Sequence, residues 1–154
     1  MSSCNILTNP SFESGSLSPW YTNTPNAARV TTSTPAYSGT HTLALSTNTT
    51  TTPSISQTLT NLTRSTTYDF SIQVLIPSTL GISSCSVSAY TGTNTSSGAI
   101  VSEDVDASGE WVAVRGEYRA RWTSDVLTVG VGGCEGGNGE GEVFMDEVVF
   151  GRGC

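Results

Sequence analysis

The chain has no lysine, a single histidine and few charged residues of any kind. Charged residues make up 12% of its 154 residues, about half the share found in an average soluble domain. All six basic residues are arginine, and they face 13 carboxylates, which gives a formal net charge of −7. This balance excludes a basic surface that tracks phosphates, and we expect no nucleic acid partner.

Long apolar runs are also missing. No stretch approaches the roughly 20 apolar residues that span a bilayer, so we expect no membrane partner. No window has the charged start and apolar centre of a signal peptide, and the leading Met-Ser-Ser resembles an expression start from which a natural leader has been cut. The length suits one hydrophobic core. We therefore expect a single domain over residues 1–154, with residues 1–3 as a flexible start.

The four cysteines lie far apart and form no CxxC pair. With His41 as the only histidine, a Cys/His metal site is not expected. An even cysteine count, the absence of lysine and a total of 47 Ser and Thr residues favour an oxidising, extracellular location. Three N-x-S/T sequons begin at Asn48, Asn61 and Asn94 and agree with secretion, although a Thr-rich chain also contains such triplets by chance.

Apolar residues alternate with polar ones along most of the chain, and no helical spacing occurs. In the segment 111–121, for example, we expect Val112, Val114 and Tyr118 to face inward, and Arg115 and Glu117 to face outward. The Thr-rich segment 46–53 and the Gly-rich segment 132–141 are expected to be loops. We expect strands over 28–31, 41–46, 55–59, 67–76, 83–90, 111–121, 126–131 and 142–150. This pattern predicts an all-β, antiparallel sandwich with one wet face on each sheet.

The order of short motifs along the chain is distinctive. The motifs are NILTNPSFE (5–13), LSPW (17–20), YSGTHTLAL (37–45), ISQTL (55–59), TYDFSI (67–72), EW (110–111) and VFMDEVVF (143–150). In this order and spacing the chain resembles the galactose-binding-like β-jelly-roll carbohydrate-binding modules of families 4, 9 and 22, especially their fungal members. The resemblance implies a non-catalytic module that binds β-glucan, xylan or a related chain in a groove across one sheet. It also implies a partner enzyme domain in a longer chain.

The resemblance further implies a structural calcium ion between the N-terminal loop and the last strand. Glu13 and Asp146 match the carboxylate ligands, and backbone oxygens would come from Ser11 and Thr40. Calcium takes six to eight oxygen ligands, which carboxylates and carbonyls supply. Some members have another acidic ligand just before the 38–40 turn, and Tyr37-Ser38 offers none. The alternative is that both carboxylates only accept hydrogen bonds from loop amides.

Sugar binding needs an aromatic face for the pyranose ring and fixed polar groups for its hydroxyls. Tyr90 is the first candidate, because it lies on the outward side of its strand with Ser88. Arg29 matches an arginine ligand of family members near the cleft edge, and Trp122 departs from the family pattern. Gln57 occupies a position where the family often has a polar group, although it shares a face with Ile55 and Leu59. The resemblance assigns Trp20, Tyr68 and Trp111 to packing.

A jelly-roll topology would place the first and last strands side by side and so bring Cys4 to Cys154. It would bring Cys85 to Cys134 if their strands are antiparallel neighbours. Four cysteines allow three pairings, and this one requires no rearrangement of the expected sheets. Free buried thiols are the alternative.

Three other functions were weighed against glycan binding. A surface or matrix protein that binds a protein partner is favoured by the lack of an obvious aromatic pair on one wet face. An enzyme is not expected, because Glu103, Asp104 and Asp106 read as a solvated acidic turn and Glu117 reads as an ion-pair partner of Arg115 and Arg119. Ice binding ranks last, since no regular Thr-x-Thr ladder repeats.

Overall fold

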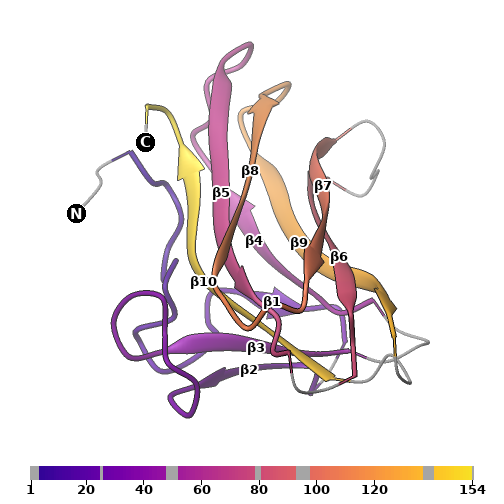
Figure 1. Ribbon diagram of the computed structural model, residues 1–154. Helices are drawn as coiled ribbons and strands as arrows, with labels where there is room; N and C mark the ends of the chain where they lie inside the picture. Colours follow the sequence, from indigo (N-terminus) through magenta and orange to yellow (C-terminus); the bar gives the residue numbers. More distant parts are fainter. Residues whose placement is uncertain are drawn as a thin grey trace.

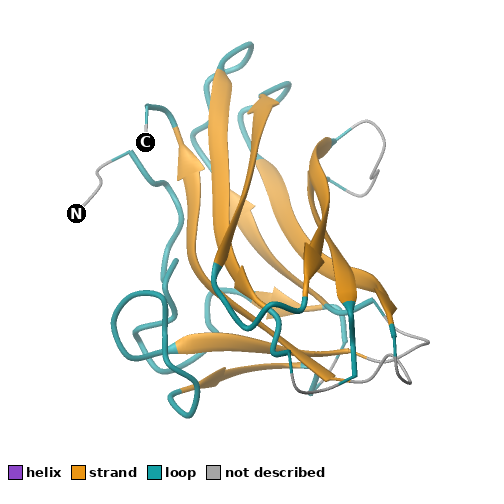
Figure 2. Cartoon of the chain, in the orientation of Figure 1, coloured by secondary structure: helices purple, strands orange, loops and turns teal. Residues whose placement is uncertain are grey.

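The structure is a computed structural model that describes residues 4–24, 26–47, 52–78, 81–92, 98–136 and 141–153. Within these ranges all regular structure is β-strand (Figure 2). No helix among the described residues is long and apolar enough to cross a bilayer. Asn48 and Asn94, which begin two of the three sequons, lie outside the described residues.

Among the described residues, ten strands form two five-stranded sheets in which all pairings are antiparallel (Figure 1). The first sheet, called the β9 sheet, has the order β1 (Tyr21–Thr22), β4 (Ser54–Leu59), β9 (Asp125–Glu135), β6 (Ser84–Thr91) and β7 (Ala99–Asp106). The second, called the β10 sheet, has the order β2 (Ala28–Thr31), β3 (Thr42–Thr47), β10 (Gly141–Gly151), β5 (Thr67–Leu75) and β8 (Val112–Arg119). The all-β sandwich expected from the alternation is confirmed.

The core lies between the two sheets and follows directly from the period-two pattern. In β5 the apolar residues Tyr68, Phe70, Ile72 and Val74 are buried, while the polar residues between them are half-buried. Phe150 of β10 stacks on Tyr68 with 5.3 Å between ring centroids. Each sheet therefore keeps one outer face, and the two outer faces point to opposite sides of the molecule.

The eight expected strands are present, with ends shifted by a few residues, and two further strands were not expected. These are the two-residue β1 and the edge strand β7. Glu103, Asp104 and Asp106 lie in β7, so the interpretation of this segment as a turn is wrong. These three carboxylates are exposed, and Val105 is the one buried residue of β7. Charged residues on an edge strand discourage pairing with another chain, which explains why the segment lacks a clear strand pattern.

The expected loop over 132–141 is also partly wrong. Strand β9 continues through Gly132 to Glu135, because Gly132 pairs with Ser86 and Glu135 with Ser84 of β6. Glycine lowers strand propensity locally, but the neighbouring strand and a disulfide hold this end of β9 in the sheet. In β8, Val114 and Tyr118 face inward as expected, whereas Val112 is 36% exposed near the sheet end.

Cys85 and Cys134 form a disulfide between β6 and β9, as expected for antiparallel neighbours. Cys4 is also disulfide-bonded, and the described residues include no free cysteine. Its expected partner, Cys154, lies outside the described residues, so that pairing stays a prediction. The adjacent Asn5 forms an isolated antiparallel bridge to Gly151, which joins the two ends of the chain.

Candidate functional site

The outer face of the β9 sheet carries two exposed or half-exposed tyrosines at the ends of one cross-strand row. Tyr21 of β1 pairs with Ser56 of β4, Ser56 with Thr128 of β9, and Thr128 with Tyr90 of β6. Residues directly opposite one another in a sheet point to the same face, so all four side chains lie on one face of the sheet, with those of Ser56 and Thr128 buried between the tyrosines. The Ser56 and Thr128 hydroxyls are 2.8 Å apart and form a hydrogen bond. Three strand spacings separate the two tyrosine backbones, about 14 Å at the usual spacing.

Next to this row, small residues form a hollow in the same face. The next row across the sheet is Ser54, Gly130, Ser88 and Ser102. The hollow has a volume of about 380 Å³ and is lined by Asn23, Thr52, Ser54, Ser86, Ser88, Tyr90, Gly130, Gly132 and Gly133. The glycines present no side chain, so the floor stays open to a ligand that lies against the strands. We call the row and this hollow together the tyrosine groove.

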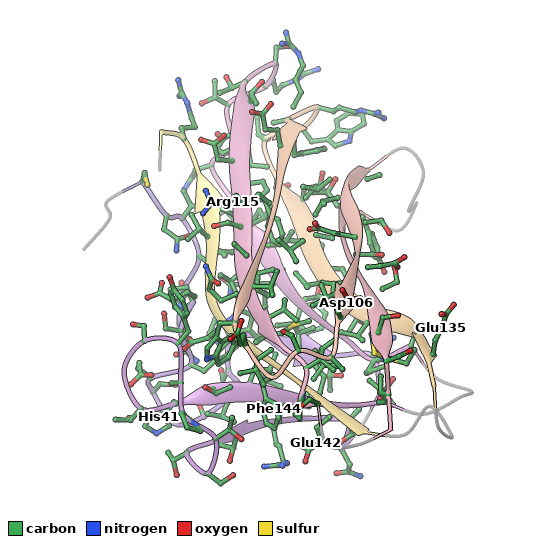
Figure 3. All side chains as sticks on the ribbon, viewed as in Figure 1. His41, Asp106, Arg115, Glu135, Glu142 and Phe144 are labelled. Carbon is green, nitrogen blue, oxygen red and sulfur yellow. A yellow bond between two sulfur atoms is a disulfide. The ribbon has the colours of Figure 1, made fainter. Side chains whose placement is uncertain are left out.

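Hydroxyl and carboxylate groups stand along the β6–β7 side of the tyrosine groove. The Ser88 and Ser102 hydroxyls are 3.1 Å apart, and those of Ser86 and Ser102 are 3.5 Å apart. Asp104 pairs with Ser86 across the strands and is exposed on the same face. In Figure 3, Asp106 and Glu135 lie farther along this same side of the molecule. Hydroxyls can donate or accept, and a carboxylate accepts, so this edge can bind the hydroxyl groups of a sugar.

At the other edge of the groove, Asn23 fixes the 52–54 segment. Its side-chain amide donates to the Thr52 carbonyl at 3.2 Å, and its side-chain oxygen accepts from the Ser54 amide at 3.0 Å. The rim is thus held by hydrogen bonds that do not use the hydroxyls of the floor. A surface with two separated phenol rings and a hollow lined by serine hydroxyls beside them suits an extended chain of pyranose rings.

Of the expected sugar-binding residues, the structure brings Tyr90 and Ser88 together in this groove. Gln57 lies outside this groove. It is buried, and its side-chain amide both accepts a hydrogen bond from the Thr8 backbone and donates one to it. The Thr8 amide donates to the Gln57 side-chain oxygen at 2.7 Å, and the Gln57 side-chain nitrogen donates to the Thr8 carbonyl at 2.9 Å. Gln57 therefore anchors the N-terminal segment and presents no free group to the groove.

Arg29 and Trp122 are also outside the groove. Arg29 lies in β2 of the β10 sheet, where its guanidinium contacts the Glu142 carboxylate at 2.6 Å. Because β2 is not part of the β9 sheet, Arg29 does not lie in the tyrosine groove, and its role in sugar binding stays a prediction. Figure 3 shows Glu142 beside β2 and β3, with Phe144 next to it. Trp122 follows β8 and lines a different hollow with Arg64.

Tyr21 was missed by the sequence interpretation. It lies next to Trp20, whose ring is buried and whose indole N–H donates to the Asn9 carbonyl at 3.0 Å. Alternation across a buried Trp20 places Tyr21 on the opposite, wet face, where it is 50% exposed. That signal was present in the sequence, but a two-residue strand is too short to reveal itself by periodicity.

The two expected calcium ligands approach one turn, residues 38–41, from two sides. The Glu13 carboxylate accepts from the Thr40 amide at 3.1 Å and from the His41 amide at 2.9 Å. The Asp146 carboxylate accepts from the Ser38 amide at 3.0 Å and from the Glu147 amide at 2.8 Å. Thr40 also donates its hydroxyl to Glu13 at 3.3 Å, and Ser11 lies two residues before Glu13.

These carboxylates differ in their surroundings. The His41 amide is the main cause that lowers the pKa of Glu13 below its usual value. Asp146 is fully buried, and burial raises its pKa to about 6 although the Ser38 and Glu147 amides oppose that shift. No arginine pairs with either group in the described part of the chain. The buried charge of Asp146 has no positive partner in the described part of the chain. A hard cation held between Asp146 and Glu13 would balance this charge. A third carboxylate ligand is not present, because no three His, Cys, Asp or Glu side chains gather among the described residues; neutral oxygens such as backbone carbonyls would complete the site.

A family described as "Carbohydrate binding domain" has a model that matches residues 4–132. No curated protein matches the chain. Among solved structures, TmCBM61 in complex with beta-1,4-galactotriose is similar, with a TM-score of 0.73 and 21% identity over 97% of this chain and 99% of that one.

Two further solved structures are similar. The CBM22-1 xylan-binding domain of Paenibacillus barcinonensis Xyn10C has a TM-score of 0.68 and 17% identity, over 98% of this chain and 97% of that one. A Clostridium thermocellum endo-1,4-beta-D-xylanase 10B structure, which holds CBM22-1 and GH10 modules with xylohexaose, has a TM-score of 0.66 and 16% identity. The similarity covers 99% of this chain and 29% of that one. These likenesses show a shared fold.

Proposed function

The chain belongs to the carbohydrate-binding domain family whose model covers residues 4–132, and we propose that its tyrosine groove binds a neutral polysaccharide of the β-glucan or xylan type without cleaving it. The observation that carries the proposal is the row of Tyr21, Ser56, Thr128 and Tyr90 across four strands. It provides two rings for stacking and, beside them, serine hydroxyls for polar contacts.

The row also indicates the direction of the bound chain. Tyr21 and Tyr90 lie on β1 and β6, with β4 and β9 between them. A glycan that contacts both rings has to cross the strands rather than follow one of them. Similar structures that contain galactotriose or xylohexaose support binding of an oligosaccharide rather than a single sugar.

Calorimetric titration with xylan and β-glucan oligosaccharides tests this proposal. We expect Tyr21→Ala and Tyr90→Ala each to weaken binding by about 1 kcal/mol or more, roughly fivefold to tenfold, because each removes one stacking ring. Tyr37→Ala is the matched control, since Tyr37 is 51% exposed but contacts Trp111, a residue that lines a hollow over the β10 sheet. Full affinity in both groove variants, or no heat with any neutral glycan, would contradict the proposal and favour a protein partner.

We also propose that Glu13 and Asp146 hold a structural calcium ion, with backbone oxygens near Ser11 and Thr40 as further ligands. The support is the buried Asp146 carboxylate, which has no cationic partner among the described residues. When bound, calcium would neutralise this charge and tie the N-terminal segment to β10 through the 38–41 turn. The residues of the tyrosine groove are not among these ligands, so we expect the ion to act on stability rather than on the glycan directly.

We further propose that the module works outside the cell and within a longer polysaccharide-degrading enzyme. The Cys85–Cys134 disulfide supports an oxidising location. The Clostridium thermocellum structure, in which this fold accompanies a GH10 module, supports the attachment. Absence of product after long incubation with xylan and β-glucan is the expected result for a module that binds without catalysis.

A further inference from the structure

Two turns at one end of the sandwich carry three of the six arginines and a strongly exposed aromatic ring. Arg64 lies in the β4–β5 turn, Arg119 ends β8, and Arg121 and Trp122 follow in the β8–β9 turn. Trp122 is 60% exposed, the largest exposed fraction among the large hydrophobic side chains of the described residues. We call these four residues the arginine end.

Backbone hydrogen bonds hold the two turns side by side, at the top of the view in Figure 1. The Leu62 amide donates to the Thr123 carbonyl at 2.9 Å, and the Ser65 amide donates to the Ala120 carbonyl at 2.8 Å. These two bonds bracket Arg64 on one turn and Arg121 and Trp122 on the other. The arginine end is therefore built on a fixed backbone.

Two hollows open at this end. One has a volume of about 320 Å³ and is lined by Arg64, Trp122, Thr123 and Ser124. The other has a volume of about 360 Å³, and its lining includes Ser65, Glu117, Arg119 and Arg121. Their linings come from the same two turns, because Ser65 follows Arg64 and Trp122 follows Arg121 in the chain. The two hollows present an indole, hydroxyl-bearing residues and arginines at this end of the sandwich.

The charge of the arginine end opposes that of the whole molecule. Three arginines line the two hollows against one carboxylate, Glu117, in a chain of net charge −7. Arg64 and Arg119 have no ion-pair partner among the described residues. The expected pairing of Glu117 with Arg115 and Arg119 is likewise not present there. Since the molecule has enough carboxylates to neutralise Arg64 and Arg119, their separation from carboxylates in the described part of the chain leaves these two guanidinium groups available for an outside anion.

We propose that the arginine end is a second carbohydrate site, which binds polysaccharides with carboxylate-bearing sugars such as uronic acids. Guanidinium groups bind carboxylates through paired hydrogen bonds, and an exposed indole accepts the apolar face of a pyranose ring. Thr123 and Ser124 line the same hollow as Trp122 and supply hydroxyl groups for contacts with the sugar. The tyrosine groove has no arginine in its lining, so the two sites would select glycans of different charge.

Calorimetric titration with a short galacturonate oligomer tests the proposal, at about 20 mM and again at about 500 mM NaCl. We expect saturable binding at low salt that weakens strongly at high salt, because its contacts are exposed ion pairs. Arg64→Ala and Trp122→Ala should each reduce affinity about tenfold, the effect of one lost charged hydrogen bond or stacking ring. Trp122→Phe should retain most of the affinity, and melting curves establish that each variant is folded.

Two matched controls separate this site from the tyrosine groove. Arg152→Ala removes an exposed arginine near the C-terminus and should leave galacturonate binding unchanged. Tyr90→Ala should weaken neutral oligosaccharides but not galacturonate, whereas Arg64→Ala should do the reverse. Failure of the groove proposal alone would therefore leave the galacturonate result intact.

Several outcomes would overturn the proposal. These are absence of binding at low salt, equal binding by Arg64→Ala and wild type, or loss of galacturonate binding in Tyr90→Ala. Stronger binding of a sulfated oligosaccharide would replace the uronate with a sulfate ester as the preferred anion. Binding of phosphatidylglycerol vesicles that depends on Arg64 and Trp122, without galacturonate binding, would assign the arginine end to a membrane surface instead.

Discussion

Ser88→Val is the sharpest test of where the glycan lies. Ser88 stands on the floor of the tyrosine groove, opposite Gly130 on one side and Ser102 on the other. Valine replaces its hydroxyl by a methyl group and adds a second methyl in the hollow of about 380 Å³. The variant thus removes one polar contact and obstructs the ligand at the same point.

The expected loss of affinity follows from these two effects. A neutral hydrogen bond contributes about 0.5–1.5 kcal/mol, so loss of the Ser88 hydroxyl alone, in Ser88→Ala, should cost up to roughly tenfold in Kd. In Ser88→Val the added methyl also displaces the sugar from the neighbouring serine hydroxyls. Loss of two contacts in total gives about 1–3 kcal/mol, or roughly 5- to 150-fold in Kd.

The fold should tolerate the change. Valine suits a strand better than serine, and the lost Ser88–Ser102 hydrogen bond is exposed. We expect the free energy of unfolding to stay within about 1 kcal/mol of the wild type. Ser71→Val is the matched control, because Ser71 is a half-buried residue on the outer side of β5 in the other sheet.

Calorimetry with the best neutral oligosaccharide, together with urea unfolding, measures both quantities. Affinity should fall in the order wild type, Ser88→Ala, Ser88→Val, with Ser71→Val unchanged. A folded Ser88→Val variant that binds like the wild type would refute a ligand lying over the groove floor.

Two further predictions concern stability. With EDTA present, burial raises the pKa of Asp146 to about 6 from its ordinary value of 3.8. Its ionisation therefore destabilises the folded state at neutral pH by about 3 kcal/mol, and protonation should restore about 1 kcal/mol of that between about pH 7 and pH 5. Urea unfolding in EDTA should show this gain on acidification, and saturating calcium should remove it; an equal pH profile with and without calcium would argue against the ion. Joint Cys85→Ser and Cys134→Ser substitution opens a loop of 49 residues and should lower the free energy of unfolding by about 4 kcal/mol. An unchanged melting temperature would contradict this role for the bridge.

The candidate site was only partly predictable from the sequence. Ser88 and Tyr90 could be assigned to one wet face, because both lie on the outward side of a clearly alternating strand. Tyr21 could not, because β1 has only two residues and takes its place from pairing with Ser56. Arg29 was a candidate because it matches an arginine ligand of the family, and Trp122 because it departs from the family pattern. Sheet membership, which a local pattern does not contain, places Arg29 in the β10 sheet, and Trp122 lines a hollow beside the β4–β5 turn.

The sequence by itself determined the alternation, and hence a β-sandwich with polar outer faces and a buried centre. This follows because side-chain direction in a strand has a period of two, which neighbouring residues reveal. Only the tertiary structure decided which strands share a sheet. Strand order joins Tyr21 to Tyr90 across β4 and β9, and backbone hydrogen bonds join the turns of Arg64 and Trp122. Both arrangements depend on contacts between residues distant in the chain, which no local pattern encodes.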